Sequence, residues 1–520
     1  MFSVLEVENS GRKFRCRQIL AFGALRALCC FSAIGLVGCG SSFSTNGITP
    51  IALENSKPGD PQWVLNNPAL RHEIEGYASA TSVNRGQTIK FFISTMDPSF
   101  TFEIFRMGWY QGAGARKVTD AVTLPGTQQV IPSPDPITGL VECRWQLSYS
   151  LTVPDKPEDP TDWTSGVYLA KLTAVPSGKQ SYTIFVVRDD QRASQYLFQS
   201  SVTTYQAYNN WGGKSLYNNG IGGKGVKVSF NRPYAPGLQP SAASGAGAGE
   251  FLTTYQPVYE TYPAGWEYNM VRFLERNGYD VTYSTDLDTH GNSALLLNHK
   301  AFLVVGHDEY WSMPMRNNVI RARDAGVNLA FFAANVSFWQ IRFEPSILTG
   351  EPDRTQVCYK DTSDPVKGVL ATINWRSLGM PEDEIIGVMY GADRVKSDIV
   401  VENTNSWVYA GTNLVAGNLL HGLLGYEVDM VQTGSPANVI VLANSPFPES
   451  GRPVQYSNMA TYTAASGAVV FATGSMHWSW GLDDYNTPTV RPSVLSIDAQ
   501  KVTDNVLMRF GAQSPDPSGP

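Results

Sequence analysis

The pattern of hydrophobic and polar positions divides the chain into two regions. Between residues 66 and 190, short apolar stretches are separated by turn residues, and no helical period lies between them. Strands spaced in this way are typical of a β-sandwich, and we expect one of immunoglobulin-like type over 66–190. The clearest predicted strands are 88–94, 101–106, 167–172 and 181–187.

From residue 191 onward the pattern changes to strands that alternate with helices. Residues 266–277 have a helical period and stop at Gly278, which suits a helix C-cap. Such alternation with short connections predicts an α/β domain with a mainly parallel sheet over 191–512. Its predicted elements are strands 279–283, 300–306 and 327–333 and helix 315–325, with further strands at 406–410, 438–443 and 468–473. Residues 513–520 are expected to form a disordered tail.

The amino-terminal residues have the features of a bacterial lipoprotein signal. Arg12, Lys13, Arg15 and Arg17 precede a short apolar run that ends in Leu-Val-Gly-Cys at Cys39. The run is too short to cross about 30 Å of hydrocarbon. We therefore expect a signal peptide with its lipobox over 1–39 and a lipid on the Cys39 thiol. Residues 40–65 would form a flexible tether, and the protein would be anchored in the bacterial cell envelope, on the outer membrane or facing the periplasm.

Charge and cysteine content narrow the possible functions. The net charge is −7, and the chain after residue 30 has no run of Lys and Arg, which excludes the basic surface that nucleic-acid binding requires. Only Cys143 and Cys358 follow Cys39. They fall in different predicted domains, so we expect neither a disulfide nor a CxxC metal site.

Candidate chemistry gathers where the predicted strands end. Ligands of open α/β sheets bind at the carboxyl ends of the strands, and strand 300–306 is followed directly by His307-Asp308-Glu309-Tyr310. In extended backbone His307 and Glu309 point to one side, and Asp308 and Tyr310 to the other. The first pair combines a carboxylate, which ligates a metal or acts as a base, with an imidazole that moves protons. The simpler alternative is that these residues only cap helices and bond backbone at the sheet edge.

A thiol mechanism finds no support in the sequence. In class I glutamine-amidotransferase-like domains a Cys nucleophile occupies a sharp turn after a strand, but the corresponding turn here is Ala333-Ala334-Asn335. Cys358 has no evident base beside it, and the motifs G-x-S-x-G and H-E-x-x-H are missing from the sequence. Metal-assisted hydrolysis is therefore the leading mechanism if the protein is an enzyme.

Several stretches together resemble the N,N-dimethylformamidase large (beta) subunit family. They are the sequences at 105–110, 204–213, 229–234, 306–312 and 474–481. The resemblance implies a class I glutamine-amidotransferase-like domain after a β-sandwich. It also implies hydrolysis of a small amide, an iron ion held by two tyrosines and one glutamate, and a small second subunit.

The resemblance also suggests roles for individual residues. The spacing His307-Asp308-Glu309 matches the family, which makes Glu309 the carboxylate ligand and His307 the proton shuttle to the leaving amine. Asn335 is expected to bond the substrate or its oxyanion. The tyrosine ligands are expected to be Tyr208 and Tyr234, with Tyr205 and Tyr268 in reserve and Tyr310 as a neighbour. The residues expected to contact substrate are Trp339, His477 and Trp478.

Two functional classes remain open at this point. The first is an iron-dependent hydrolase of amide or other non-peptide C–N bonds, acting with a second subunit or as a homo-oligomer. The alternative is a non-catalytic, surface-anchored module whose Trp and Tyr side chains bind glycans or proteins. A hydrolase that uses another metal, or none, is a third possibility.

Overall fold

The computed structural model describes residues 8–9, 12–13, 48–156, 159, 162–218, 223–255, 262–448 and 453–512. The chain forms two compact units, 1–42 and 43–520. In the first, β1 (Glu8–Asn9) and β2 (Arg12–Lys13) pair antiparallel. Cys39, residues 40–47 of the predicted tether and the tail 513–520 lie outside the described residues. Within the described ranges, no helix is both long and apolar enough to cross a membrane.

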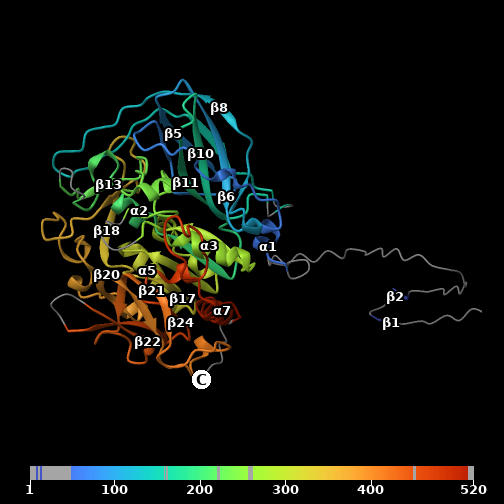
Figure 1. Cartoon of the computed structure of the whole chain (residues 1–520), viewed down its shortest axis with the longest axis vertical. Coiled ribbons are helices and arrows are strands. Elements are labelled where there is room, and N and C mark those ends of the chain that lie inside the picture. The colour runs from blue at the N-terminus through green and yellow to red at the C-terminus, as the bar shows by residue number, and fades with distance from the viewer. Residues whose placement is uncertain are drawn as a thin grey trace, which may run out of the picture. The chain divides into compact units, whose positions relative to one another are not determined.

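The first part of the larger unit contains two β-sheets with a shared apolar core (Figure 1). Six strands form one sheet in the order β4-β11-β10-β6-β7, with β8 also paired to β6, and three form the other in the order β3-β5-β9. Rings from both sheets meet in the core, where the Phe91 centroid lies 5.0 Å from that of Phe102 and 5.5 Å from that of Phe185. The strands of the larger sheet are β4 (Ser82–Asn84), β6 (Ser99–Met107), β7 (Ala115–Lys117), β8 (Val122–Pro125), β10 (Gly166–Val175) and β11 (Gln180–Arg188). Those of the smaller sheet are β3 (Ile74–Ala78), β5 (Thr88–Thr95) and β9 (Tyr149–Thr152).

A seven-stranded mixed sheet carries the rest of the chain, in the order β14-β12-β15-β17-β24-β23-β22. Neighbours from β14 to β24 are parallel, whereas β23 is antiparallel to both β24 and β22. The strands are β12 (Tyr196–Ser200), β14 (Val281–Thr285), β15 (Ala301–His307), β17 (Asn328–Ala334), β22 (Ile440–Phe447), β23 (Gln455–Thr463) and β24 (Val469–Ala472).

The prediction of a mainly parallel α/β fold is wrong. In the described chain, strand residues outnumber helical ones, and most sheets are antiparallel or mixed. The longest strands, β20 (Met389–Val400) and β21 (Leu419–Met430), form an antiparallel pair. The predicted strand 406–410 lies instead in a 3-10 helix, Trp407–Tyr409. Strands alternate with helices only up to residue 334. The prediction assumed the same alternation beyond residue 334, where most strands pair with antiparallel neighbours.

Side-chain alternation explains how helices cover the mixed sheet. In β15, Leu303 and Val305 belong to one apolar cluster, whereas Phe302 and Val304 belong to another. Helices α3 (Glu267–Arg276) and α7 (Ile497–Ala512) contribute to the first cluster, and α5 (Met313–Asp324) to the second, so helices cover both faces. The other helices are α1 (Pro50–Asn55), α2 (Val202–Tyr208), α4 (Asp286–Gly291) and α6 (Asp383–Ile386). A four-stranded sheet is formed by β13 (Lys227–Ser229), β19 (Thr355–Val357), β18 (Trp339–Glu344) and β16 (Tyr310–Ser312).

A buried ion pair joins the two-sheet region to the mixed sheet. Arg106 on β6 donates through both terminal nitrogens to the Glu275 carboxylate on α3, each at 2.8 Å, and neither side chain is exposed. Tyr283 and Asn55 also donate to Glu275, at 2.9 and 2.8 Å. Asn55 belongs to α1, so residues 48–65 of the predicted tether take part in the packed structure, where Ile51 is buried.

Candidate functional site

The candidate site begins at the carboxyl end of β15. Gly306 has φ +70°, and a Cβ there would lie 2.6 Å from the Trp266 Cβ, so only glycine fits this turn. The turn brings His307 and Glu309 to the same side, with His307 Nε2 3.6 Å from Glu309 Oε2. The Glu309 backbone N–H donates to Thr204 Oγ1 at 2.9 Å, which fixes the position of the carboxylate.

Two phenols converge on the Glu309 carboxylate. Tyr208, the last residue of α2, donates to Oε2 at 2.9 Å, and Tyr217 lies 2.8 Å from Oε2 and 3.0 Å from Oε1. The two rings stack with centroids 4.3 Å apart. The Tyr310 hydroxyl donates to that of Tyr217. We call Tyr208, Tyr217 and Glu309 the phenol–carboxylate cluster.

A second carboxylate faces the other side of His307. Glu427 Oε2 on β21 lies 3.3 Å from His307 Nε2 and accepts a hydrogen bond from Asn335 Nδ2 at 2.5 Å. Asn335 follows β17 with φ +52°, a conformation that few non-glycine residues adopt, and Asp429 accepts from its N–H at 2.8 Å. The side-chain amide of Asn335 therefore points at His307, and its Nδ2 lies 3.4 Å from His307 Nε2.

Burial and charge set the protonation of these groups. Burial and the neighbouring Glu309 raise the pKa of both Tyr208 and Tyr217 well above the ordinary value. Burial lowers the pKa of His307, but the carboxylates of Glu427 and Glu309 outweigh it and raise this pKa to about 9. Without a cation, both phenols therefore stay protonated as donors to Glu309, and the imidazole is held as a cation.

Lys360 lies on the outer side of the cluster. Its Nζ is 3.3 Å from the centroid of the Tyr217 ring, 5.1 Å from that of Trp339 and 5.2 Å from that of Tyr310, an aromatic surround suited to a cation. Burial lowers the pKa of Lys360 to about 8, and Glu309 partly opposes this shift. Trp339, predicted to contact substrate, is therefore near the cluster, in contact with Lys360.

The other tyrosines proposed from the sequence contact groups other than Glu309 in the described chain. Tyr234 lines a pocket, with its ring 6.3 Å from that of Tyr205, and Tyr268 donates to the Gly114 carbonyl at 2.6 Å. Tyr217, which the sequence prediction did not include, is the second tyrosine that contacts Glu309. Sequence analysis passed over Tyr217, Glu427 and Lys360, because no motif or strand end marks them.

His477 and Trp478, also predicted to contact substrate, belong to a different region. His477 stacks on Trp480 with ring centroids 4.0 Å apart, and Trp478 Nε1 donates to Thr503 Oγ1 at 3.0 Å. Both side chains are buried, and within the described residues neither contacts the phenol–carboxylate cluster.

The buried His477 should make the protein sensitive to acid. Burial lowers the pKa of His477 to about 3, so the folded protein resists a proton that the unfolded chain takes up near pH 6.5. Stability is therefore complete above about pH 6.5 and falls as the pH drops toward about 3. We expect the free energy of unfolding in urea to fall about 2 kcal/mol less in His477→Gln than in wild type between about pH 7.5 and pH 5. Equal losses in both proteins would contradict this, and the exposed His421→Gln is the control.

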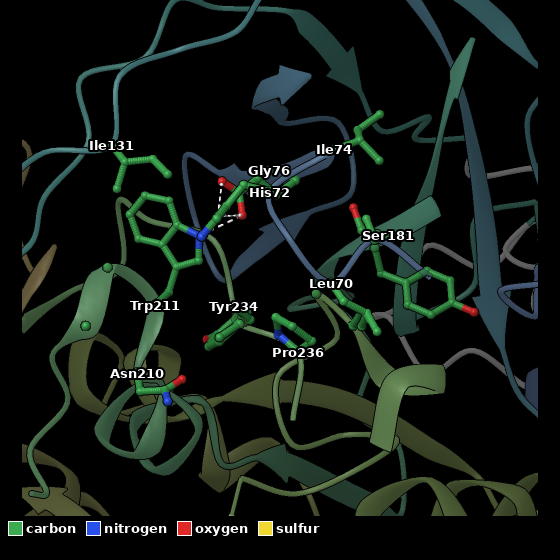
Figure 2. A pocket seen from close by; sticks show the side chains of 18 of the residues that line it. Leu70, His72, Ile74, Gly76, Ile131, Ser181, Asn210, Trp211, Tyr234 and Pro236 are labelled. Carbon is green, nitrogen blue, oxygen red and sulfur yellow. Dashed lines mark hydrogen bonds and ion pairs between the residues drawn. The ribbon is translucent and has the colours of Figure 1, made fainter. Parts of the chain in front are cut away.

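A pocket of about 380 Å³ opens between the two-sheet region and the loops on either side of β13 (Figure 2). Trp211 Nε1 and His72 Nδ1 both contact the Glu75 carboxylate in its wall, at 2.7 and 2.9 Å. Tyr217 lines the pocket as well, and so belongs both to this wall and to the phenol–carboxylate cluster.

The phenol–carboxylate cluster offers a donor set suited to a hard metal ion. Two phenol oxygens lie within 3.0 Å of one carboxylate, and phenolate and carboxylate are hard anionic oxygen ligands that favour Fe(III). In the described chain, no group of three His, Cys, Asp or Glu side chains could hold a metal. Two of the three oxygen donors of the phenol–carboxylate cluster come from tyrosine, outside those residue types, and a donor set of this kind suits Fe(III).

Comparison with known proteins identifies the family. Residues 101–490 match the family model described as N,N-dimethylformamidase beta subunit-like, C-terminal. The N,N-dimethylformamidase beta subunit of an Alcaligenes species is 22% identical over 455 residues, and that of Paracoccus aminophilus is 22% identical over 457. Each match covers 73% of this chain and 56% of the relative, so the chain spans about half the length of these relatives. Because the family model covers most of the sequence, the chain belongs to the N,N-dimethylformamidase beta subunit-like, C-terminal family.

Proposed function

We propose that the protein is an iron-dependent hydrolase of amide or other non-peptide C–N bonds. The observation that carries the proposal is the convergence of the Tyr208 and Tyr217 hydroxyls on the Glu309 carboxylate. Membership of a family whose curated relatives are named dimethylformamidase subunits supports it. When bound by Tyr208, Tyr217 and Glu309, iron supplies Lewis acidity that polarises an amide carbonyl and acidifies water.

The residues around the cluster suit the proton transfers of amide hydrolysis. Water adds to the carbonyl carbon, the C–N bond breaks, and the departing nitrogen needs one proton to leave as an amine. His307, held between Glu309 and Glu427, is placed to deliver that proton. The Asn335 side chain, 3.4 Å from His307 Nε2, is placed to orient the substrate or its oxyanion.

Metal analysis of the purified protein is the most direct test. We expect about one iron per chain and a visible absorption band from tyrosinate bound to iron. Incubation with N,N-dimethylformamide should release dimethylamine at a rate that tracks iron content. Full activity in iron-free protein would overturn the iron dependence, and iron without amine release would overturn the proposed reaction.

A second subunit is part of the proposal. Both relatives are named as beta subunits, and this chain spans 56% of each. We therefore propose that activity depends on a further polypeptide or on self-association. Copurification of a stoichiometric partner, or a mass above one chain in solution, would support this arrangement.

The binding-module alternative has less support. Stacking on glycans needs exposed aromatic rings, but Trp211, Trp311, Trp375 and Trp478 are almost fully buried, and Tyr456 is the aromatic side chain exposed in the described ranges. A single exposed ring among the described residues gives little support for stacking on a glycan chain.

The proposed lipid anchor has a separate test. If Cys39 carries a lipid, Cys39→Ser should move most of the protein from the membrane fraction to the soluble fraction, because a diacylglyceryl group provides the membrane affinity. Sedimentation of lysates with immunodetection measures the distribution. Cys30→Ser, which changes a cysteine inside the predicted signal, is the matched control and should remain with the membrane. An unchanged distribution of Cys39→Ser would contradict lipidation.

A further inference from the structure

We infer that the 380 Å³ pocket binds the body of an uncharged amide much larger than dimethylformamide, with the scissile group directed at Tyr217. The inference rests on the proposed function for its chemistry and concerns the substrate class. Residues far apart in sequence form the pocket, among them Leu70, Glu75, Ser181, Trp211, Tyr217 and Leu238.

Size is the first argument. Sites for molecules of drug size span about 300 to 1,000 Å³, and a cavity of about 150 Å³ already holds benzene. A pocket of 380 Å³ therefore has room for a ring or a branched aliphatic group in addition to the amide. An amide of the size of dimethylformamide would leave most of it to water.

The lining defines which larger molecules suit the pocket. Leu70, Ile131 and Leu238 are exposed apolar side chains, at 48%, 40% and 55%, and all three lie in the pocket wall. Tyr217 and Tyr234, which are both half-buried, add aromatic surface. Apolar side chains that remain exposed in a concave wall favour a ligand with an apolar body.

Polar groups in the wall favour a neutral ligand over an anion. None of the described lining residues is Lys or Arg, and Glu75 contributes a carboxylate whose contacts are Trp211 and His72. An anionic ligand would meet that carboxylate with only His72 to offset it. Ser181 Oγ, in a side chain that is 3% exposed, lies buried in the wall without a hydrogen-bond partner. It can bond an amide oxygen or N–H.

Tyr217 connects the pocket to the chemistry. It lines the pocket, and its hydroxyl contacts both oxygens of Glu309. Tyr208 stacks on the Tyr217 ring, and the Lys360 ammonium group also contacts this ring. These two neighbours hold the ring in place. A ligand that fills the pocket therefore ends against a residue of the phenol–carboxylate cluster.

Binding of matched probes to the full chain tests the inference. Titration calorimetry would compare benzamide with N,N-dimethylformamide, which differ in size, and with benzoate, which differs from benzamide mainly in charge. We expect benzamide to bind at least about tenfold more tightly than either, because ring burial adds apolar contact and Glu75 disfavours an anion. Leu238→Trp should fill the pocket and weaken benzamide binding about tenfold. Leu370→Trp, at an exposed leucine outside the pocket, should not change it.

The outcomes separate this inference from the proposed function. Benzamide that binds no better than dimethylformamide, or no better than benzoate, overturns the inference, as does equal binding by Leu238→Trp and Leu370→Trp. Glu309→Gln should keep benzamide binding within about threefold of wild type, because Glu309 does not line the pocket. Tight benzamide binding without release of ammonia refutes the hydrolase and leaves the pocket assignment standing. Hydrolysis of dimethylformamide by a protein that binds benzamide no more tightly supports the hydrolase and overturns the pocket assignment.

Discussion

Glu309→Gln is expected to abolish binding of the proposed iron and to lower the hydrolytic rate more than about 100-fold. Removing groups that only support a metal ligand already costs about 10- to 100-fold in metal affinity or activity, and Glu309 is the carboxylate on which both phenols converge. The amide is nearly the same size as the carboxylate, so packing is preserved while the anionic oxygen is lost. Iron content by elemental analysis and amine release measure the two effects.

Glu402→Gln is the matched control for that substitution. Glu402 is exposed, so its replacement removes the same charge without touching the cluster. Its iron content and rate should equal those of wild type. Retention of iron by Glu309→Gln at the wild-type level would contradict the assigned ligand, provided that both variants unfold at the same temperature as wild type.

Tyr217→Phe is expected to have the second largest effect. It removes one of two phenol oxygens beside Glu309 and leaves the ring, and therefore its stacking on Tyr208 and its contact with Lys360. Iron affinity should fall by more than about tenfold, and the absorption band from tyrosinate should weaken. Iron titration followed by visible spectroscopy measures both quantities.

Tyr234→Phe separates this geometry from the residue assignment made on sequence alone. Tyr234 lines the pocket, and the phenols that contact Glu309 in the described chain are those of Tyr208 and Tyr217, so Tyr234→Phe should bind iron as wild type does. Loss of iron in Tyr234→Phe with retention in Tyr217→Phe would restore the sequence-based assignment and reject the one drawn from the structure.

Local patterns in the sequence predicted one part of the geometry of the candidate site. The buried strand before His307 and the alternation of side chains beyond it predicted that His307 and Glu309 would share a side, and their side chains lie 3.6 Å apart. Asn335 follows the neighbouring strand and lies 3.4 Å from His307 Nε2 for the same reason. Parallel neighbours bring their carboxyl ends to one edge, so short-range patterns are sufficient there.

The other part depends on contacts that no local pattern encodes. Tyr217 lies in a loop, and Glu427 lies within β21, whose pairing with β20 is antiparallel. Lys360 lies in a loop, has φ +66° and contacts the ring of Tyr217 in the phenol–carboxylate cluster. The mainly parallel fold was wrong for a related reason. A short apolar run does not reveal the direction of its partner, and the runs after residue 334 pair mostly with antiparallel neighbours.

The Arg106–Glu275 pair also bears on how this protein can be divided. A fusion that packed a different module on this face of α3 would bury Glu275 without Arg106 and Asn55, leaving Tyr283 as the donor to its carboxylate. Removing one partner of a buried ion pair costs about 3 to 5 kcal/mol, a large part of the stability of an average domain. The β-rich amino-terminal region is therefore not an interchangeable module: any recombination or gene fusion that covers α3 with another domain must supply a new cation for Glu275.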